Sequence, residues 1–189
     1  MAPPAGAAGA RLLWLLRHAK TVPDPPPGGT DHERPLAPRG RRDADALARR
    51  LGPGGDRLGL PAGTLPQLVL CSSATRTAQT AERVLAEVDQ APPVTHLRSL
   101  YAATPEGVLD ELRMVDDEVG AAMVVGHNPT MHDLVAGLPA ADDLAGRRLL
   151  EERGVPTCTV AVLLLPPDEP WSAVAEGTAR LVNLSIPPF

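Results

Sequence analysis

Leu12–His18, which reads LLWLLRH, is a continuously apolar run that ends in a basic pair. A short run of this kind is typical of a strand that is buried on both faces of a parallel sheet. The arrangement recurs at residues 68–76 (LVLCSSATR) and 123–129 (MVVGHNP). Ligands of open α/β sheets bind beyond the carboxyl ends of the strands, so we expect the side chains that follow these runs to share one pocket. These side chains are Arg17, His18, Arg76 and His127.

Two guanidinium groups and two imidazoles favour an anion with several oxygens as the ligand. Arginine donates paired hydrogen bonds that match the geometry of phosphate, and a neutral imidazole can attack phosphorus. The guanidinium groups could also neutralise the charge that develops on the phosphoryl oxygens. This chemistry needs no cofactor and no metal, and His127 and His132 are one residue too far apart for the usual helical zinc pair.

The totals predict one globular domain that does not bind nucleic acid. The chain has 189 residues, of which 43% are hydrophobic, and its formal net charge is −5. An acidic chain lacks the broad basic surface that nucleic acid requires, and an aromatic content of 2% gives no stacking platform. We expect a flexible leader at residues 1–10, rich in Ala, Pro and Gly, and a single domain at residues 11–189.

The expected location is the cytoplasm. The chain has no apolar stretch that approaches the length of a membrane span, and its first residues do not have the pattern of a signal peptide, so no membrane partner is expected. Cys71 and Cys158 both lie in apolar runs, which predicts buried free thiols and no disulfide.

Strands alternate with helices along the chain, which predicts a three-layer α/β/α sandwich. The central sheet is expected to be mostly parallel, with an antiparallel edge strand. Ser72 or Ser73 is expected to cap the second helix, and Asn128 the fourth, with Pro129 in its first turn. The expected strands are residues 12–16, 68–71, 93–97, 121–125, 157–165 and 179–184, and the expected helices are residues 38–51, 74–88, 105–115, 129–135 and 144–153.

Residues 22–30 are crowded with proline and glycine and are predicted to form a loop close to the pocket. The charged run Asp31–Arg34 follows this loop and could contact a substrate. A solvated charge run is the more common explanation of such a pattern.

Four motifs give the chain a resemblance to a known family. In order, they are LLRHAK at residues 15–20, RPL followed by RG at residues 34–40, SSATRTAQT at residues 72–80 and VGHNP at residues 125–129. In their order and spacing, these motifs resemble the histidine phosphatase superfamily, whose fold is shared with the phosphoglycerate mutases. The likeness is greatest to its small bacterial branch, the SixA-type phosphohistidine phosphatases.

The resemblance implies that His18 is a nucleophile that becomes transiently phosphorylated. It also implies that Arg17, Arg76 and His127 hold the phosphoryl oxygens, and Asn128 is a further candidate for phosphate binding. Attack requires a neutral His18, which its unperturbed pKa of about 6.5 allows near neutral pH. His127 would contribute more if it were protonated.

The chain departs from the family at the expected proton donor. Many members supply a carboxylic acid after the third strand, where this chain reads SLYAATPE at residues 99–106. Glu106 and Asp110 are the candidate donors, although acids in the first turns of a helix also interact favourably with its dipole. An alkoxide leaves badly without a proton donor, whereas imidazole leaves more readily, so protein phosphohistidine is the substrate that fits best.

Two other functions stay open. One is a general phosphomonoesterase or mutase that acts on a small phosphorylated metabolite, with Glu106 or Asp110 as its acid. The other is a catalytically idle module that uses the same pocket to bind phosphorylated proteins or metabolites.

Overall fold

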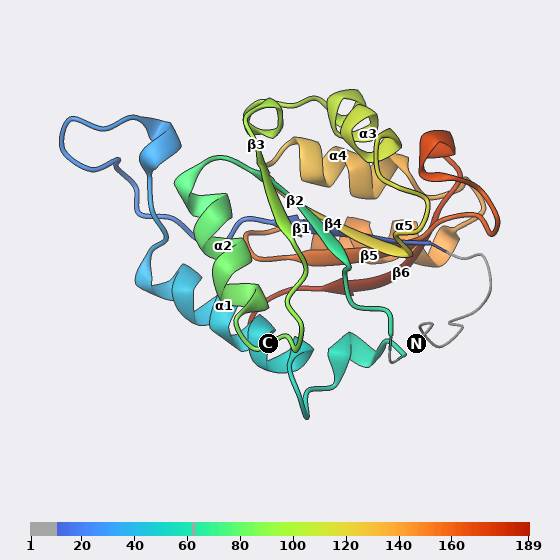
Figure 1. The fold of residues 1–189 in the computed structure, drawn as a ribbon, viewed down its shortest axis with the longest axis horizontal. Coiled ribbons are helices and arrows are strands. Elements are labelled where there is room, and N and C mark those ends of the chain that lie inside the picture. The colour runs from blue at the N-terminus through green and yellow to red at the C-terminus, as the bar shows by residue number, and fades with distance from the viewer. Residues whose placement is uncertain (1–10, 62) are drawn as a thin grey trace.

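The computed structural model describes residues 11–61 and 63–189, so the expected leader at residues 1–10 lies outside the described part of the chain. Six strands form one sheet in the order β3-β2-β4-β1-β5-β6 (Figure 1). Strands β3, β2, β4 and β1 run parallel, whereas β5 is antiparallel to both of its neighbours, β1 and β6. The strands are β1 (Leu12–Arg17), β2 (Leu68–Ser72), β3 (Val94–Leu97), β4 (Ala121–Gly126), β5 (Val160–Leu164) and β6 (Arg180–Ser185).

Helices cover both faces of the sheet, which confirms the predicted three-layer sandwich. Helices α1 and α2 pack together on one face, and α3, α4 and α5 lie on the other. The helices are α1 (Pro38–Leu51), α2 (Thr75–Leu85), α3 (Pro105–Arg113), α4 (Thr130–Gly137) and α5 (Leu144–Arg153). Short 3₁₀ turns lie at Asp31–Glu33, Arg57–Gly59, Ser99–Tyr101 and Trp171–Ala173.

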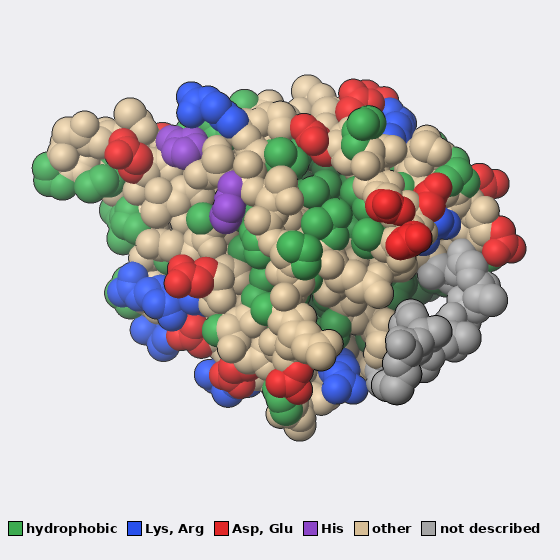
Figure 2. Space-filling view, viewed as in Figure 1, with side chains coloured by type: hydrophobic (Ala, Val, Ile, Leu, Met, Phe, Trp, Pro, Cys, Tyr) green, Lys and Arg blue, Asp and Glu red, His purple; other side chains and the backbone are tan. Residues whose placement is uncertain are grey.

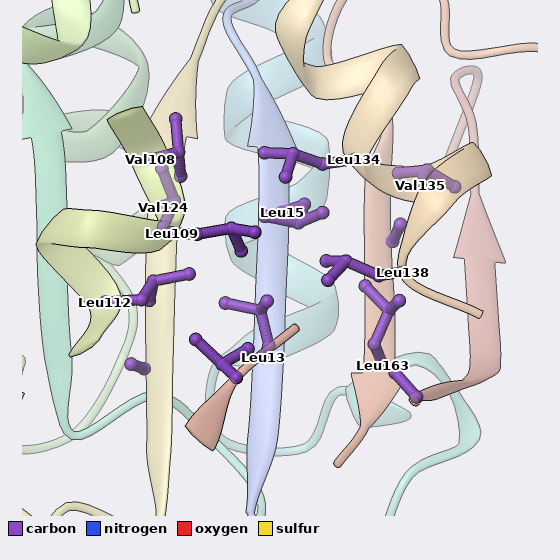
Figure 3. Close-up of a cluster of buried hydrophobic side chains, with 14 of the residues drawn as sticks. Leu13, Leu15, Val108, Leu109, Leu112, Val124, Leu134, Val135, Leu138 and Leu163 are labelled. Carbon is purple, nitrogen blue, oxygen red and sulfur yellow. The ribbon is translucent and has the colours of Figure 1, made fainter. Parts of the chain in front are cut away.

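Strand β1 lies between the two hydrophobic cores and contributes side chains to both, which explains its unbroken apolar sequence. Side chains alternate between the two faces of a strand. Leu13 and Leu15 therefore join the cluster beneath α3 and α4 (Figure 3), whereas Trp14 and Leu16 join the cluster beneath α1 and α2. All four side chains are at most 1% exposed.

Two predicted helix caps are wrong. The residue that precedes α2 is Ala74, and the hydroxyls of Ser72 and Ser73 instead lie 2.8 Å and 2.9 Å from ring nitrogens of His127 and His32. Helix α4 begins at Thr130, and the side chain of Asn128 donates from Nδ2 to the carbonyl of Val155 at 3.1 Å. Serine and asparagine side chains also form hydrogen bonds with distant partners, and here those partners replace the local cap.

Close packing holds the segment after His18 against α1. A Cβ atom at Gly40 would lie 2.1 Å from the carbonyl oxygen of Lys20, so only glycine permits this approach. Thr21 and Leu36 pair as an isolated bridge at the base of the loop that contains residues 22–30. This loop has neither helix nor strand, as predicted, and extends away from the sheet in Figure 1.

The cysteine prediction is confirmed. Cys71 and Cys158 are free and buried, and burial raises the pKa of each thiol to about 12. Within residues 11–61 and 63–189, no helix has the length and apolar character needed to cross a membrane.

Candidate active site

His18 lies directly beyond the carboxyl end of β1 and is 9% exposed. Its Nδ1 atom is 2.8 Å from the carbonyl oxygen of Ala19. A carbonyl can only accept a hydrogen bond, so Nδ1 carries the proton. The other ring nitrogen, Nε2, then has an unshared electron pair, which gives it the capacity to act as a nucleophile.

A hydrogen-bonded chain fixes His18 relative to helix α2. The backbone N–H of Ala19 donates to Thr80 Oγ1 at 3.0 Å, and this hydroxyl donates to the carbonyl of Arg76 at 2.6 Å. Thr80 is fully buried, so no water competes for these bonds. The backbone that carries the imidazole is thereby tied to the backbone that carries the guanidinium.

Arg76 and His127 are in direct contact beside His18. Arg76 Nε donates to Nδ1 of His127 at 3.3 Å, which leaves the proton of His127 on Nε2, 2.8 Å from Ser72 Oγ. The ring centroids of His18 and His127 are 5.2 Å apart. Figure 2 shows histidine surface on the side of the molecule from which the loop of residues 22–30 extends.

Arg17 and Asn128 share one carbonyl. The Nη1 atom of Arg17 and the Nδ2 atom of Asn128 donate to Val155 O at 2.8 Å and 3.1 Å. Within the described residues, neither Arg17 Nε nor Asn128 Oδ1 has a hydrogen-bond partner, although both atoms are buried. The segment that follows α5 therefore orients both side chains.

The charged run Asp31–Arg34 belongs to this cluster, although a charge run of this kind is more commonly exposed to solvent and without a function. Arg76 donates from Nη1 to the carbonyl of Asp31 at 2.8 Å, and its Nη2 lies 3.2 Å from Asp31 Oδ2. The same carboxylate oxygen accepts from the hydroxyl of Tyr101 at 2.9 Å, and Arg34 Nη2 lies 3.0 Å from Oδ1. The neighbourhood of the RPL motif was the sequence signal for Arg34, whereas nothing in the sequence indicated that Tyr101 would lie here.

His32 and Tyr101 extend the cluster of rings. The centroid of the Tyr101 ring is 4.8 Å from that of His32 and 5.7 Å from that of His127, with edge-to-face geometry in both pairs. The guanidinium carbon of Arg76 is 5.6 Å from the centre of the Tyr101 ring. Tyr101 thus occupies the region after β3 in which the family resemblance had placed a carboxylic acid.

Both imidazoles are neutral near neutral pH. Burial lowers the pKa of His18 to about 4. The hydrogen bond with Ala19 O opposes this lowering, and the charges of Arg76, Arg17 and Arg34 add to it. Burial and the charge of Arg76 lower the pKa of His127 to about 3. His18 therefore has the protonation state that nucleophilic attack requires, whereas a protonated His127 would require a nearby anion.

Glu106 and Asp110 lie apart from this cluster. Both carboxylates are ion-paired with Nη1 of Arg113, at 2.5 Å and 2.9 Å, and both side chains are mostly exposed. His132 is also exposed, with Nδ1 3.4 Å from Asp133 Oδ1. In the part of the chain that the structure describes, no group of histidine, cysteine and carboxylate side chains could hold a metal ion.

A cavity of about 380 Å³ adjoins the cluster on the side of His127. It is lined by residues 100–105 and 126–131, together with Val108, Val124 and Asp133. Its volume lies within the range of small-molecule sites. Neither Glu106 nor Asp110 lines it.

We predict that the buried neutral imidazoles reduce the stability of the protein in mild acid. Their pKa values are about 4 and about 3 when folded, against about 6.5 in the unfolded chain. Their contribution to the free energy of unfolding is complete above about pH 6.5 and decreases as the pH falls through the folded pKa values, because only the unfolded chain takes up these protons. Urea unfolding measured over this range should show the decrease, and His18→Gln should make it shallower. NMR titration midpoints near 6.5 for both rings would contradict the prediction.

Comparisons with known proteins give the family of the chain. Residues 13–101 match the family model of the histidine phosphatase superfamily (branch 1). An uncharacterized protein of Mycobacterium tuberculosis, Rv1276c, is 38% identical over 175 residues, which cover 91% of this chain and 99% of the relative. The chain belongs to the histidine phosphatase superfamily, and it is a phosphatase.

Solved structures place the chain close to one branch of the family. A structure from Nakamurella multipartitia that bears the phosphohistidine phosphatase name SixA has a TM-score of 0.76 and 31% identity, covering 96% of this chain and 99% of that one. A SixA structure from Agrobacterium tumefaciens has a TM-score of 0.71 and 28% identity, covering 94% and 98%. The fold alone is shared with a phosphoglycerate mutase of Plasmodium falciparum, at a TM-score of 0.56, 15% identity and coverage of 93% and 90%.

Proposed function

We propose that this phosphatase hydrolyses phosphohistidine on a partner protein through a covalent phosphohistidine intermediate on His18, without a metal or another cofactor. The observation that carries the proposal is the state of His18. Its Nδ1 proton is held by Ala19 O, its pKa is lowered to about 4, and its ring lies 5.2 Å from that of His127. The names of the SixA relatives support the same substrate class.

The reaction has two displacements at phosphorus. In the first, Nε2 of His18 forms a bond to phosphorus while the P–N bond of the substrate breaks, and the departing imidazole takes up a proton from the solvent. In the second, the oxygen of a water molecule forms a bond to phosphorus while the bond between phosphorus and Nε2 of His18 breaks. The protons of the water leave with the phosphate, and the His18 ring is again neutral. Arg17, Arg76 and Asn128 hold the phosphoryl oxygens, so that the charge on them is neutralised in each transition state.

His127 acts as a donor once the phosphoryl group is in place. A dianion beside the ring favours its protonated form, so Nδ1, which accepts from Arg76 Nε at 3.3 Å, would gain a proton. Arg76 Nε and His127 Nδ1 would then both point hydrogen-bond donors at the phosphoryl oxygens. In the proposed reaction, the charge of the substrate thus replaces the hydrogen bond between Arg76 Nε and His127 Nδ1 by two hydrogen bonds to the phosphoryl oxygens.

The state of the carboxylates near the site favours a phosphoramidate substrate, which depends less on a proton donor. Glu106 and Asp110 are paired with Arg113. Asp31 faces the site, but the hydrogen bond from Tyr101 and the charges of Arg76 and Arg34 outweigh its burial and lower its pKa, so it is ionised and has no proton to donate. Imidazole leaves more readily than an alkoxide under these conditions. Free Cys71 and Cys158 are consistent with a cytoplasmic location for this reaction.

A substrate panel tests the proposal: a phosphohistidine peptide, phosphoramidate, phosphoserine and a sugar phosphate. We expect kcat/KM for the peptide to exceed that for the sugar phosphate by about 100-fold or more. The double variant Glu106→Gln with Asp110→Asn should keep its phosphoramidate turnover. If the wild type prefers the sugar phosphate, and the double variant no longer turns it over, the function is that of a phosphomonoesterase or mutase. Tight binding of phosphate analogues without turnover of any substrate would establish the binding module.

A further inference from the structure

The cavity beside His127 is placed to receive the group that leaves phosphorus. His127 and Tyr101 line it and also belong to the cluster around Arg76, whereas Arg17, His18 and Arg76 do not line it. In-line attack by His18 drives the leaving group away from His18. The cavity therefore adjoins the proposed reacting centre at His127, and His18 does not line it.

The walls of the cavity are largely apolar. Leu100, Val108, Val124 and Met131 are buried in its lining. The hydroxyls of both threonines are used within the protein, since Thr104 Oγ1 accepts from the backbone of Gly107 at 3.2 Å and Thr130 Oγ1 donates to Ala103 O at 2.5 Å. A flat ring gains from such walls, whereas a heavily hydrated group would lose hydrogen bonds to water.

The charge of the cavity opposes a second anion. Of the residues that line it, none is lysine or arginine, and the one carboxylate is that of Asp133, whose side chain is 49% exposed. Asp133 lies in the first turn of α4. Because it lines the cavity and is also half-exposed, its carboxylate lies at the rim of the cavity, in contact with solvent. A phosphate or carboxylate on the leaving group would enter without a lysine or arginine to pair with, whereas a basic neighbour would be attracted.

We propose that this cavity is the leaving-group subsite, and that it accepts the imidazole of phosphohistidine from a peptide with basic flanking residues and discriminates against leaving groups that carry a second anion. The inference rests on the proposed function and adds the surface that selects the substrate. Asp133 is the specificity-determining residue, because it supplies the negative charge at the rim.

Filling the cavity tests the first half of the proposal. Ala103→Phe places a ring in the cavity wall, and Ala86→Phe places the same ring on the exposed end of α2 as a control. Ala103→Phe should lower kcat/KM for a phosphohistidine peptide by about 10-fold or more, yet change phosphoramidate turnover by less than about twofold, because its leaving group is ammonia. Ala86→Phe should change neither. An equal effect of Ala103→Phe on both substrates, or no effect, would overturn the subsite.

Reversing the charge tests the second half. Asp133→Lys changes the rim, and Asp142→Lys makes the same change of charge at an exposed position that does not line the cavity. The measured quantity is the ratio of kcat/KM for a lysine-flanked phosphohistidine peptide to that for a glutamate-flanked one. Asp133→Lys should lower this ratio about fivefold, and Asp142→Lys should lower it by less than about twofold. An unchanged ratio in Asp133→Lys, or equal changes in both variants, would overturn the role of Asp133.

The two levels of the proposal fail in different ways. Wild-type protein that turns over neither phosphoramidate nor a phosphohistidine peptide refutes the proposed function, and the subsite with it. Wild-type protein that turns over both, with preferences unaltered by Ala103→Phe and Asp133→Lys, refutes the subsite alone.

Discussion

Replacing His18 by alanine is expected to lower kcat for phosphohistidine hydrolysis by about 10⁴-fold or more. His18 is the group whose Nε2 forms the bond to phosphorus in the proposed reaction, and its removal eliminates both displacements. His127 is not placed to substitute for it, because both of its ring nitrogens are in hydrogen bonds, to Arg76 and to Ser72. The residual rate would come from the groups that hold the phosphoryl oxygens in the proposed reaction.

A labelling experiment reports on the same step directly. Wild-type protein mixed with substrate that carries radioactive phosphate and then quenched should retain label that is lost in acid and stable in alkali, the behaviour of a phosphorylated imidazole. His18→Ala should carry none. His132→Ala removes an exposed imidazole and serves as the matched control, which should label as the wild type does. Equal labelling of His18→Ala would show that another residue is the nucleophile.

The sequence predicted the positions of the strands because each carries its own signal. An unbroken apolar run such as that of β1 is typical of a strand that is buried on both faces. In the structure, Leu13 packs in the core on one face of the sheet and Trp14 in the core on the other. The basic residues at the ends of such runs converge because parallel strands present their carboxyl ends at one edge. Arg17, His18, Arg76 and His127 could be chosen without knowledge of any contact between them.

The rest of the site depends on contacts that no local pattern encodes. Asp31 follows a proline-rich loop and joins the site only because the loop returns to place its carboxylate near Arg76 and Tyr101. Ser72 is a residue type that often caps helices, yet its hydroxyl bonds to His127, which is 55 residues away in the sequence. At Ser72 a local cap and a long-range partner compete for the same hydroxyl, and the long-range partner prevails.

Replacing Arg76 by alanine is expected to lower kcat/KM by about 10²- to 10³-fold. Arg76 is 6% exposed, so in the proposed reaction its charge acts on the phosphoryl group with little screening. It also has three other partners, His127 Nδ1, Asp31 O and Asp31 Oδ2, so the substitution removes a donor to the substrate and the group that fixes His127. Arg76→Lys should recover only part of the rate, because a lysine supplies charge without the paired geometry.

Two further variants separate charge from positioning at this arginine. Asp31→Asn removes the carboxylate that neutralises Arg76, so it should strengthen the binding of a phosphate analogue, whereas Arg76→Ala should weaken it. Arg83→Ala removes another guanidinium of helix α2, one that pairs with Asp45 at 2.8 Å. This variant should keep both binding and turnover within about twofold of the wild type. Urea unfolding of each variant shows whether the fold survives. If folded Arg76→Ala binds the analogue as tightly as the wild type does, the oxyanion is held elsewhere, and the convergence of the strand ends at Arg76 and His127 would serve structure and not catalysis.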